Sequence, residues 1–222
     1  MPDRFTHNLV IFARAPRRGA VKRRLAADIG DGAAITFYRN TLRDTLRRLG
    51  GDPRWRTWLA VTPDSAVTGA QAGLLTPPLT GVSGISKRPQ GAGHLGIRMR
   101  RPLLLPGRPG ALPPGPAVIV GSDIPGITPA HIARAFAALG SHDFVFGPAT
   151  DGGYWLAGAR RRPALPHGLF DGVRWSSEHA LADTLAGLPA SVRVALIDAL
   201  DDVDDGAAYE RWRVRRGLAH AA

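Results

Sequence analysis

Short apolar runs recur along the chain, separated by turns that are rich in polar residues, Gly and Pro. Each run has strand length and is dominated by β-branched, aromatic or small apolar residues. These runs predict buried strands at residues 9–13, 55–61, 117–120, 144–146, 154–158 and 192–197. A further strand is predicted near residues 79–82, within a stretch that is otherwise rich in Gly, Pro, Ser and Thr.

Segments with helical spacing of apolar residues lie between these runs. They predict helices at residues 21–29, 31–49, 93–105, 129–139, 206–216 and from a cap at 176 or 177 to 186. Thr128 is a good N-cap, with Pro129 at the first helical position. The alternation of strands and helices indicates an α/β fold with a mostly parallel central sheet flanked by helices.

A single domain spanning residues 1–222 is expected, since 222 residues with 44% hydrophobic content suffice for one full-size core. The Pro- and Gly-rich segment 106–116 is interpreted as an exposed loop, because the strand after it must join the same sheet. Cysteine is absent, which excludes disulfides, thiolate catalysis and Cys-based zinc sites.

The formal charge of +11 favours anionic ligands, phosphates in particular. The basic residues are nearly all Arg and are scattered, without a basic helix interleaved with stacking aromatics, so we expect no nucleic-acid partner. No apolar stretch approaches the roughly 18 residues of a membrane span, and no signal-peptide core begins the chain. We therefore expect a cytoplasmic protein with no membrane span.

Asp123 is the most informative residue. It follows the apolar run 117–120 and the small pair Gly121-Ser122, and open α/β sheets bind ligands outside the carboxyl ends of their strands. Asp151 stands in a similar place after the run 144–146, within a loop that contains Gly152 and Gly153. An Asp before Pro can simply form a turn or a helix cap, but two such acids on successive strand ends favour a site.

A basic turn follows the first predicted strand and surrounds Gly19 at the entrance to a helix. Backbone N–H groups at a helix start, with nearby cations, suit a nucleotide phosphate, although a solvated charge run would look the same. The pattern is neither a Walker A loop nor a dinucleotide-binding glycine motif. Its basic residues are Arg14, Arg17, Arg18, Lys22, Arg23 and Arg24.

Carboxylates grouped near predicted strand ends suggest a site for Mg²⁺ or Mn²⁺, which prefer oxygen ligands. The group comprises Asp123, Asp151 and the acidic run 201–205, although acids before Gly206 could equally cap a helix. A third candidate element is the segment 90–99, where Gln90 and Gly93 at a helix entry could hold a base or ribose. Its alternative interpretation is a flexible helix start.

The ordered set of motifs resembles the GT-A-fold glycosyltransferase-like proteins related to the phospholactate guanylyltransferases. The motifs are Gly19-x-Val21-Lys22-x-Arg24-Leu25, Gln90-Gly91-x-Gly93-x-Leu95-Gly96-x-Arg98-Met99, Gly121-Ser122-Asp123-x-Pro125, Gly147-Pro148-Ala149-x-Asp151-Gly152-Gly153-Tyr154, Val173-x-Trp175-Ser176 and Asp202-Val203-Asp204. The resemblance implies a nucleotide-diphospho-sugar transferase type of sheet that binds a nucleotide-sugar or NTP, a small-molecule acceptor and a divalent metal.

The resemblance, together with the patterns described above, leads us to expect roles for individual residues. Metal binding falls to Asp123, Asp202 and Asp204, and catalysis to Asp123, Asp151 and Lys22. Nucleotide or phosphate binding falls to Arg14, Gly19, Lys22, Arg24, Gln90, Gly93 and Ser122. Acceptor binding falls to Gly152, Gly153, Tyr154, Trp175 and Ser176.

Three functions follow from these expectations. Glycosyl transfer from a nucleotide-sugar is preferred, and the alternative is nucleotidyl transfer from an NTP to a small phosphorylated acid. A catalytically silent nucleotide-binding module is the third. It is motivated by departures from the family pattern, namely Arg23 in place of Thr, His94 in place of an acid and Asp205 in place of Thr.

Overall fold

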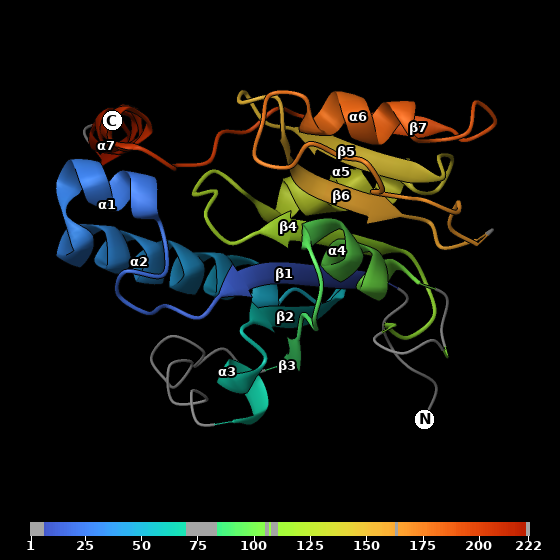
Figure 1. The fold of residues 1–222 in the computed structure, drawn as a ribbon, viewed down its shortest axis with the longest axis horizontal. Coiled ribbons are helices and arrows are strands. Elements are labelled where there is room, and N and C mark those ends of the chain that lie inside the picture. Colours follow the sequence, from blue (N-terminus) through green and yellow to red (C-terminus); the bar gives the residue numbers. More distant parts are fainter. Residues whose placement is uncertain (1–6, 70–83, 105–106, 108–110, 163, 221–222) are drawn as a thin grey trace.

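The computed structural model describes residues 7–69, 84–104, 107, 111–162 and 164–220. A seven-stranded sheet forms its centre, with strand order β3-β2-β1-β4-β6-β5-β7 (Figure 1). The strands are β1 (Asn8–Arg14), β2 (Arg56–Thr62), β3 (Ile85–Pro89), β4 (Ala117–Gly121), β5 (Phe144–Pro148), β6 (Tyr154–Ala159) and β7 (Val194–Leu196). The helices are α1 (Arg23–Ile29), α2 (Asp31–Gly50), α3 (Ser65–Thr68), α4 (Leu95–Leu103), α5 (Pro129–Ala138), α6 (Ala180–Ala186) and α7 (Gly206–His220).

The sheet is mostly parallel, as predicted, and among the described strands only β6 runs against its neighbours. β1 pairs in parallel with both β2 and β4, and β5 pairs in parallel with β7. β6 pairs antiparallel with β4 and β5 because it returns from β5 through the short turn at residues 149–153. The parallel strands thus end at one edge of the sheet, which is the edge where Asp123 was expected.

Alternating strand residues divide the core between the two faces of the sheet. Leu9 and Ile11 of β1 pack on the side of α2 and α5, whereas Val10 packs on the side of α4. Figure 1 shows α4 in front of the sheet. A third cluster joins α1, α2 and α7 around the buried Phe37, with Tyr209 and Trp212 packed edge-on against it.

Several predicted elements shift at their ends. The helix predicted at residues 21–29 begins at Arg23, and the one predicted from 176 or 177 begins at Ala180. β3 was not predicted, while the strand predicted near 79–82 lies outside the described residues. Among the described helices, none has the length and apolar character needed to cross a membrane.

The N-terminus of α5 carries a capping box. Thr128 accepts from the backbone N–H of His131, and the His131 ring accepts from the backbone N–H of Thr128 at 3.1 Å. Burial, followed by the charge of Arg134, lowers the pKa of His131 from its ordinary 6.5, and Asp198 partly opposes this shift. The neutral ring is therefore the form that the folded protein prefers.

We predict that His131 makes the protein less stable in acid. Because its pKa is lower in the folded state, the unfolded chain takes up the proton first as pH falls below about 6.5, and stability is lost from there downwards. Thermal denaturation from pH 7.5 to 5.0 should show a larger decline for the native protein than for His131→Gln, which preserves the capping box. Parallel declines in the two proteins would contradict this.

Candidate active site

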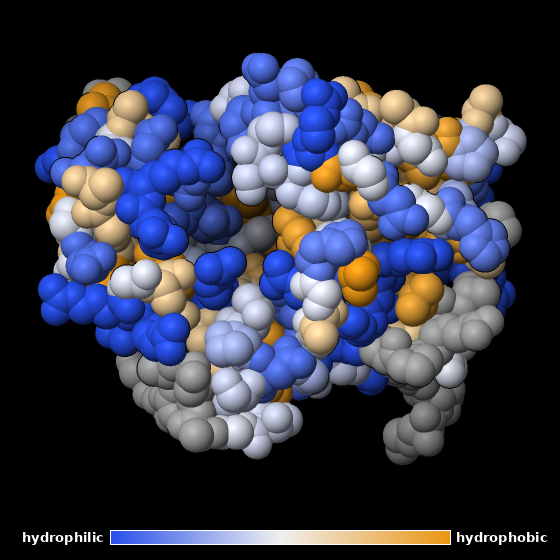
Figure 2. All heavy atoms as spheres, viewed as in Figure 1, coloured by the Kyte–Doolittle hydropathy of each residue, from blue (hydrophilic) through white to orange (hydrophobic). Residues whose placement is uncertain are grey.

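A cleft opens outside the carboxyl ends of β1, β2 and β4. Figure 2 shows the hollow near the middle of this face, bordered by strongly hydrophilic surface on the side of α1. Lys22, Ser122 and Asp123 line it from the first turn and from the end of β4. The two elements that sequence patterns placed at strand ends therefore meet in one cleft.

Lys22 forms the centre of this cleft. Its side chain is 3% exposed, and its Nζ lies 2.8 Å from Asp123 Oδ2 and 3.2 Å from Asp204 Oδ1. Burial lowers the pKa of Lys22, but the charges of Asp123 and Asp204 outweigh it, so the pKa is raised overall. The residue also has left-handed backbone, with φ of 50°. Such geometry is unfavourable for a non-glycine residue and persists only where surrounding contacts hold it.

Three carboxylates gather beside Lys22. Asp123, Asp202 and Asp204 each offer an oxygen within 4.8 Å of the others. Burial raises the pKa of Asp202 to about 6, and the charges of Asp123, Asp204 and Asp151 add to this while Lys22 opposes it. The group therefore holds more negative charge than Lys22 compensates.

The acidic run 201–205 contributes both to the carboxylate cluster and to a helix cap, the two roles that its sequence suggested. Asp205 caps α7 by accepting from the backbone N–H of Ala208 at 2.8 Å, and Asp201 accepts from Thr150 at 2.6 Å. Asp202 and Asp204 instead face Asp123.

The cluster fits a hard divalent cation in its chemistry. All three groups supply oxygen, and each is only partly buried, so a cation could reach them. The Lys22 ammonium already contacts Asp123 and Asp204, so a divalent cation would share these carboxylates with it.

Cations line the cleft from β1, from the turn and helix that follow it, and from α4. Arg14, Arg24 and Arg98 line it together with Lys22. Burial, followed by the guanidinium groups of Arg14 and Arg101, lowers the pKa of Arg98, with Asp64 opposing. Arg24, whose side chain is 68% exposed, lies 3.3 Å from Asp204.

Tyr38 connects the ends of β1 and β4 beneath these cations. Its buried hydroxyl accepts from the backbone N–H of Arg14, donates to the Arg14 carbonyl and lies 3.2 Å from Ser122 Oγ. Burial raises the pKa of Tyr38 to about 12, so it remains a neutral phenol. Ser122 was predicted at the nucleotide, and its side chain lies at the base of the cleft in contact with Tyr38.

Gln90 holds the scaffold rather than presenting an open amide. Its Nε2 donates to the carbonyls of Ala13 and Ala60, both at 3.0 Å, and its Oε1 accepts from Arg98 at 2.7 Å. Both ends of this amide are thus engaged within the protein, and the contact of Gln90 with a base or ribose stays a prediction. Gly93 lines a neighbouring hollow with Arg14, and Gly19 forms an exposed turn with φ of 72°.

The turn at residues 149–153 forms the opposite wall. Asp151 accepts from the backbone N–H of Gly153 at 2.9 Å and lines a second cavity together with Asp123 and Tyr154. Gly152, with φ of 81°, packs against the backbone of Glu178, where a Cβ would lie 2.1 Å from the carbonyl oxygen. Gly152 thus fixes the turn, whereas Asp151 and Gly153 face the cavity.

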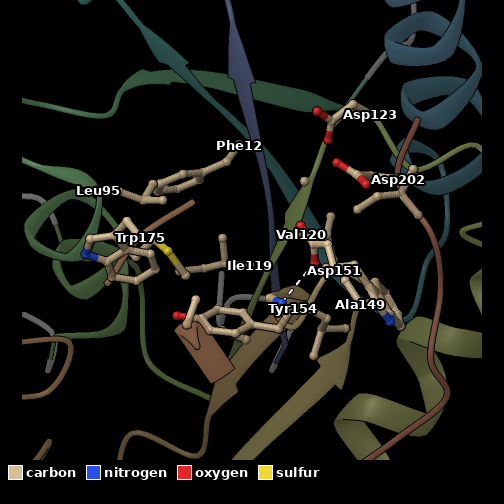
Figure 3. Close-up of a pocket in the computed structure, with 18 of the residues that line it drawn as sticks. Phe12, Leu95, Ile119, Val120, Asp123, Ala149, Asp151, Tyr154, Trp175 and Asp202 are labelled. Atoms are coloured by element: carbon tan, nitrogen blue, oxygen red, sulfur yellow. Dashed lines mark hydrogen bonds between the residues drawn. The ribbon is translucent and has the colours of Figure 1, made fainter. Parts of the chain in front are cut away.

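The second cavity is mainly apolar. Figure 3 shows Phe12, Leu95, Ile119, Tyr154 and Trp175 gathered across the cavity from the carboxylates of Asp123 and Asp202. Ser176 lines both cavities and has left-handed backbone, with φ of 60°.

Sequence reasoning did not single out Tyr38, Phe12, Leu95 or Arg98 as site residues. Leu95 and Arg98 stood within a quoted motif, which was their only signal. His94 and Arg23, which depart from the family pattern, are both exposed. Arg23 lines the basic side of the cleft, whereas His94 is the N-cap residue of α4 without a side-chain cap hydrogen bond.

Comparison with known proteins places the fold. A family described as "Uncharacterized protein conserved in bacteria (DUF2064)" matches residues 45–177. No curated protein matches the sequence. A Desulfovibrio desulfuricans G20 crystal structure, described provisionally as a nucleotide-diphospho-sugar transferase, is 25% identical with a TM-score of 0.74, covering 90% of this chain and 83% of its own.

More distant structures share the fold alone. The 4-diphosphocytidyl-2C-methyl-D-erythritol synthase of Anaerococcus prevotii is 11% identical, with a TM-score of 0.54 over 95% of this chain and 97% of its own. The inositol-1-phosphate CTP transferase of T. maritima is also 11% identical, with a TM-score of 0.51 over 93% and 92%. The expected α/β architecture of nucleotide-diphospho-sugar transferases is confirmed.

We predict that Lys22→Met tightens Mn²⁺ binding about tenfold, equivalent to about 1.4 kcal/mol. The Lys22 ammonium repels a divalent cation and already pairs with two of the three carboxylates that would bind this cation. Two charges 4 Å apart interact by about 4 kcal/mol near a protein surface, and solvent reduces this at carboxylates that are a third exposed. Isothermal titration without nucleotide measures the change.

Arg23→Met is the matched control, because it removes the same charge from an exposed position. Circular dichroism checks that Lys22→Met folds. Arg24→Met, which removes the exposed partner of Asp204, should tighten binding in the same direction by less. Unchanged or weaker Mn²⁺ binding in folded Lys22→Met would contradict the prediction.

Proposed function

The chain belongs to the bacterial family DUF2064, and we propose that it is a metal-dependent transferase that uses an activated nucleotide donor, with glycosyl transfer from a nucleotide-sugar preferred. The observation that carries this proposal is the meeting of Lys22, Asp123, Asp202 and Asp204 at the carboxyl edge of parallel strands. The similar structure from Desulfovibrio desulfuricans, described provisionally as a nucleotide-diphospho-sugar transferase, supports it.

The donor's phosphates are assigned to the basic side of the cleft. Lys22, Arg14, Arg24 and Arg98 line it, and guanidinium groups bind phosphate oxygens through paired donors. Lys22 is held in place by Asp123 and Asp204, so it needs little reorganisation as charge develops on the departing diphosphate.

Asp123, Asp202 and Asp204 would hold Mg²⁺ or Mn²⁺, which when bound would neutralise negative charge on the diphosphate. Asp123 lines both cavities and so stands where donor and acceptor meet. Its side chain is 33% exposed, which leaves it accessible from the cleft.

Asp151 is assigned to the acceptor hydroxyl. The hydroxyl oxygen bonds to the anomeric carbon of the sugar, and its proton passes to the Asp151 carboxylate. The bond between that carbon and the diphosphate oxygen breaks, and the nucleoside diphosphate leaves with the electron pair. The Gly153 N–H fixes the orientation of Asp151, as a general base requires.

We predict that Asp123→Asn abolishes metal-enhanced nucleotide binding and lowers the transfer rate about 100-fold or more, the scale for losing one electrostatic group at a reacting centre. Calorimetric titration of GTP, CTP, UDP-sugars and GDP-sugars, with and without Mn²⁺, measures the binding. Asp201→Asn is the matched control, because Asp201 belongs to the same region but contacts Thr150 and Arg215. Binding that is indifferent to metal and to Asp123 would favour the silent module.

The leaving product separates the two transfer reactions. Glycosyl transfer releases a nucleoside diphosphate from a nucleotide-sugar, whereas nucleotidyl transfer releases pyrophosphate from an NTP. We expect the nucleoside diphosphate, detected by chromatography after incubation with the donor that binds most tightly. Pyrophosphate as the sole product would support nucleotidyl transfer instead.

A further inference from the structure

The second cavity forms a distinct subsite, which we call the apolar pocket. It lies between β4, β6, α4 and the segment that carries Trp175, and Asp123, Asp151 and Asp202 stand along one side of it (Figure 3). Its apolar wall comprises Phe12, Leu95, Met99, Ile119, Tyr154 and Trp175.

The charges of the apolar pocket are of one sign. Among the described residues that line it, three carry carboxylates, and none is Lys, Arg or His. The basic side of the cleft differs, because Arg14, Lys22, Arg23, Arg24 and Arg98 line it. The two halves share Phe12, Leu95, Asp123 and Ser176, so the division by charge runs through the cleft at Asp123.

This division bears on the acceptor. In the metal-free protein, a phosphorylated acceptor would bring about two negative charges to a wall that already holds Asp123, Asp151 and Asp202. Lys22 pairs with Asp123 from outside this lining, and none of the described lining residues is a cation that could pair with the phosphate. An uncharged body would instead gain roughly 25 cal/mol for each Å² of apolar surface that it buries. Tyr154 and Trp175 offer aromatic surfaces, inclined at 67° to each other, that suit a ring or a C–H face.

We infer that the apolar pocket binds an uncharged acceptor, with an apolar or planar body, that presents its hydroxyl group to Asp151. This inference rests on the proposed function, since it names the substrate class of the same site. It disfavours the small phosphorylated acid that the nucleotidyl alternative requires, and it assigns anionic groups to the donor side only.

Binding of two matched probes tests the inference without any transfer reaction. 4-Nitrobenzyl alcohol and 4-nitrobenzyl phosphate share one skeleton and differ in charge, and both quench tryptophan emission when bound near Trp155 and Trp175. EDTA removes metal, and inorganic phosphate occupies the basic side. The alcohol is expected to bind about tenfold more tightly than the phosphate, a difference of about 1.4 kcal/mol.

Three variants locate the effect. Trp175→Ala should weaken binding of the alcohol about tenfold, the scale of a lost aromatic contact with its buried area. Asp151→Asn should strengthen binding of the phosphate and bring the two affinities closer together, because the like charge that opposes the phosphate is removed. Asp201→Asn, whose side chain contacts Thr150 and Arg215, should change neither.

Tighter binding of the phosphate than of the alcohol would overturn the inference. A complete lack of binding of the alcohol would also overturn it, as would binding of the alcohol that is unchanged in Trp175→Ala. Each of these results leaves the proposed function intact if metal-enhanced nucleotide binding still depends on Asp123. Loss of that dependence, with selective binding of the alcohol retained, would instead remove the proposed function and leave an apolar binding pocket.

Discussion

The buried ammonium of Lys22 is the contact on which the site depends. A cation only 3% exposed loses most of its hydration, and its ion pairs with Asp123 at 2.8 Å and Asp204 at 3.2 Å offset that loss. These pairs join three segments that are far apart in sequence, namely the first turn, the end of β4 and the segment before α7. Without the ammonium, the carboxylates would repel one another in a partly buried place.

The same contact organises the cleft by charge. Because Lys22 compensates Asp123 and Asp204 from the side of β1, the other cations, Arg14 and Arg98, remain available on that side for an anion. Asp151, across the cleft, forms no ion pair with the described residues and instead accepts from the Gly153 N–H. A molecule that spans both halves must therefore place its anionic part near Lys22.

Sequence patterns located the strand ends but could not supply their partners. The run before Asp123 and the turn before Lys22 are local signals, since a buried strand that ends in small residues and a charged residue is readable from neighbours alone. The pairing of Lys22 with Asp204 spans 182 residues, and no local pattern encodes it.

An apolar run does not encode the direction of its strand either, so β6 was predicted as a strand without its antiparallel pairing. Gln90 was expected to contact a ligand because an amide can form hydrogen bonds with a nucleotide base as well as with the protein backbone. Only the structure shows that its Nε2 donates to the carbonyls of Ala13 and Ala60.

Overall charge is a weaker guide to this site than local charge. The chain carries +11, yet its central cluster is acidic, and burial together with the neighbouring carboxylates raises the pKa of Asp202 to about 6. A surplus of negative charge inside a basic protein draws cations to one place and leaves the surrounding arginines for anions. Donor phosphates bridging the two would meet the acceptor at Asp123, because this residue borders both halves of the cleft. Under the proposed function, the order of charges along the cleft, from arginine to carboxylate to apolar wall, would set the direction in which donor, reacting bond and acceptor are arranged.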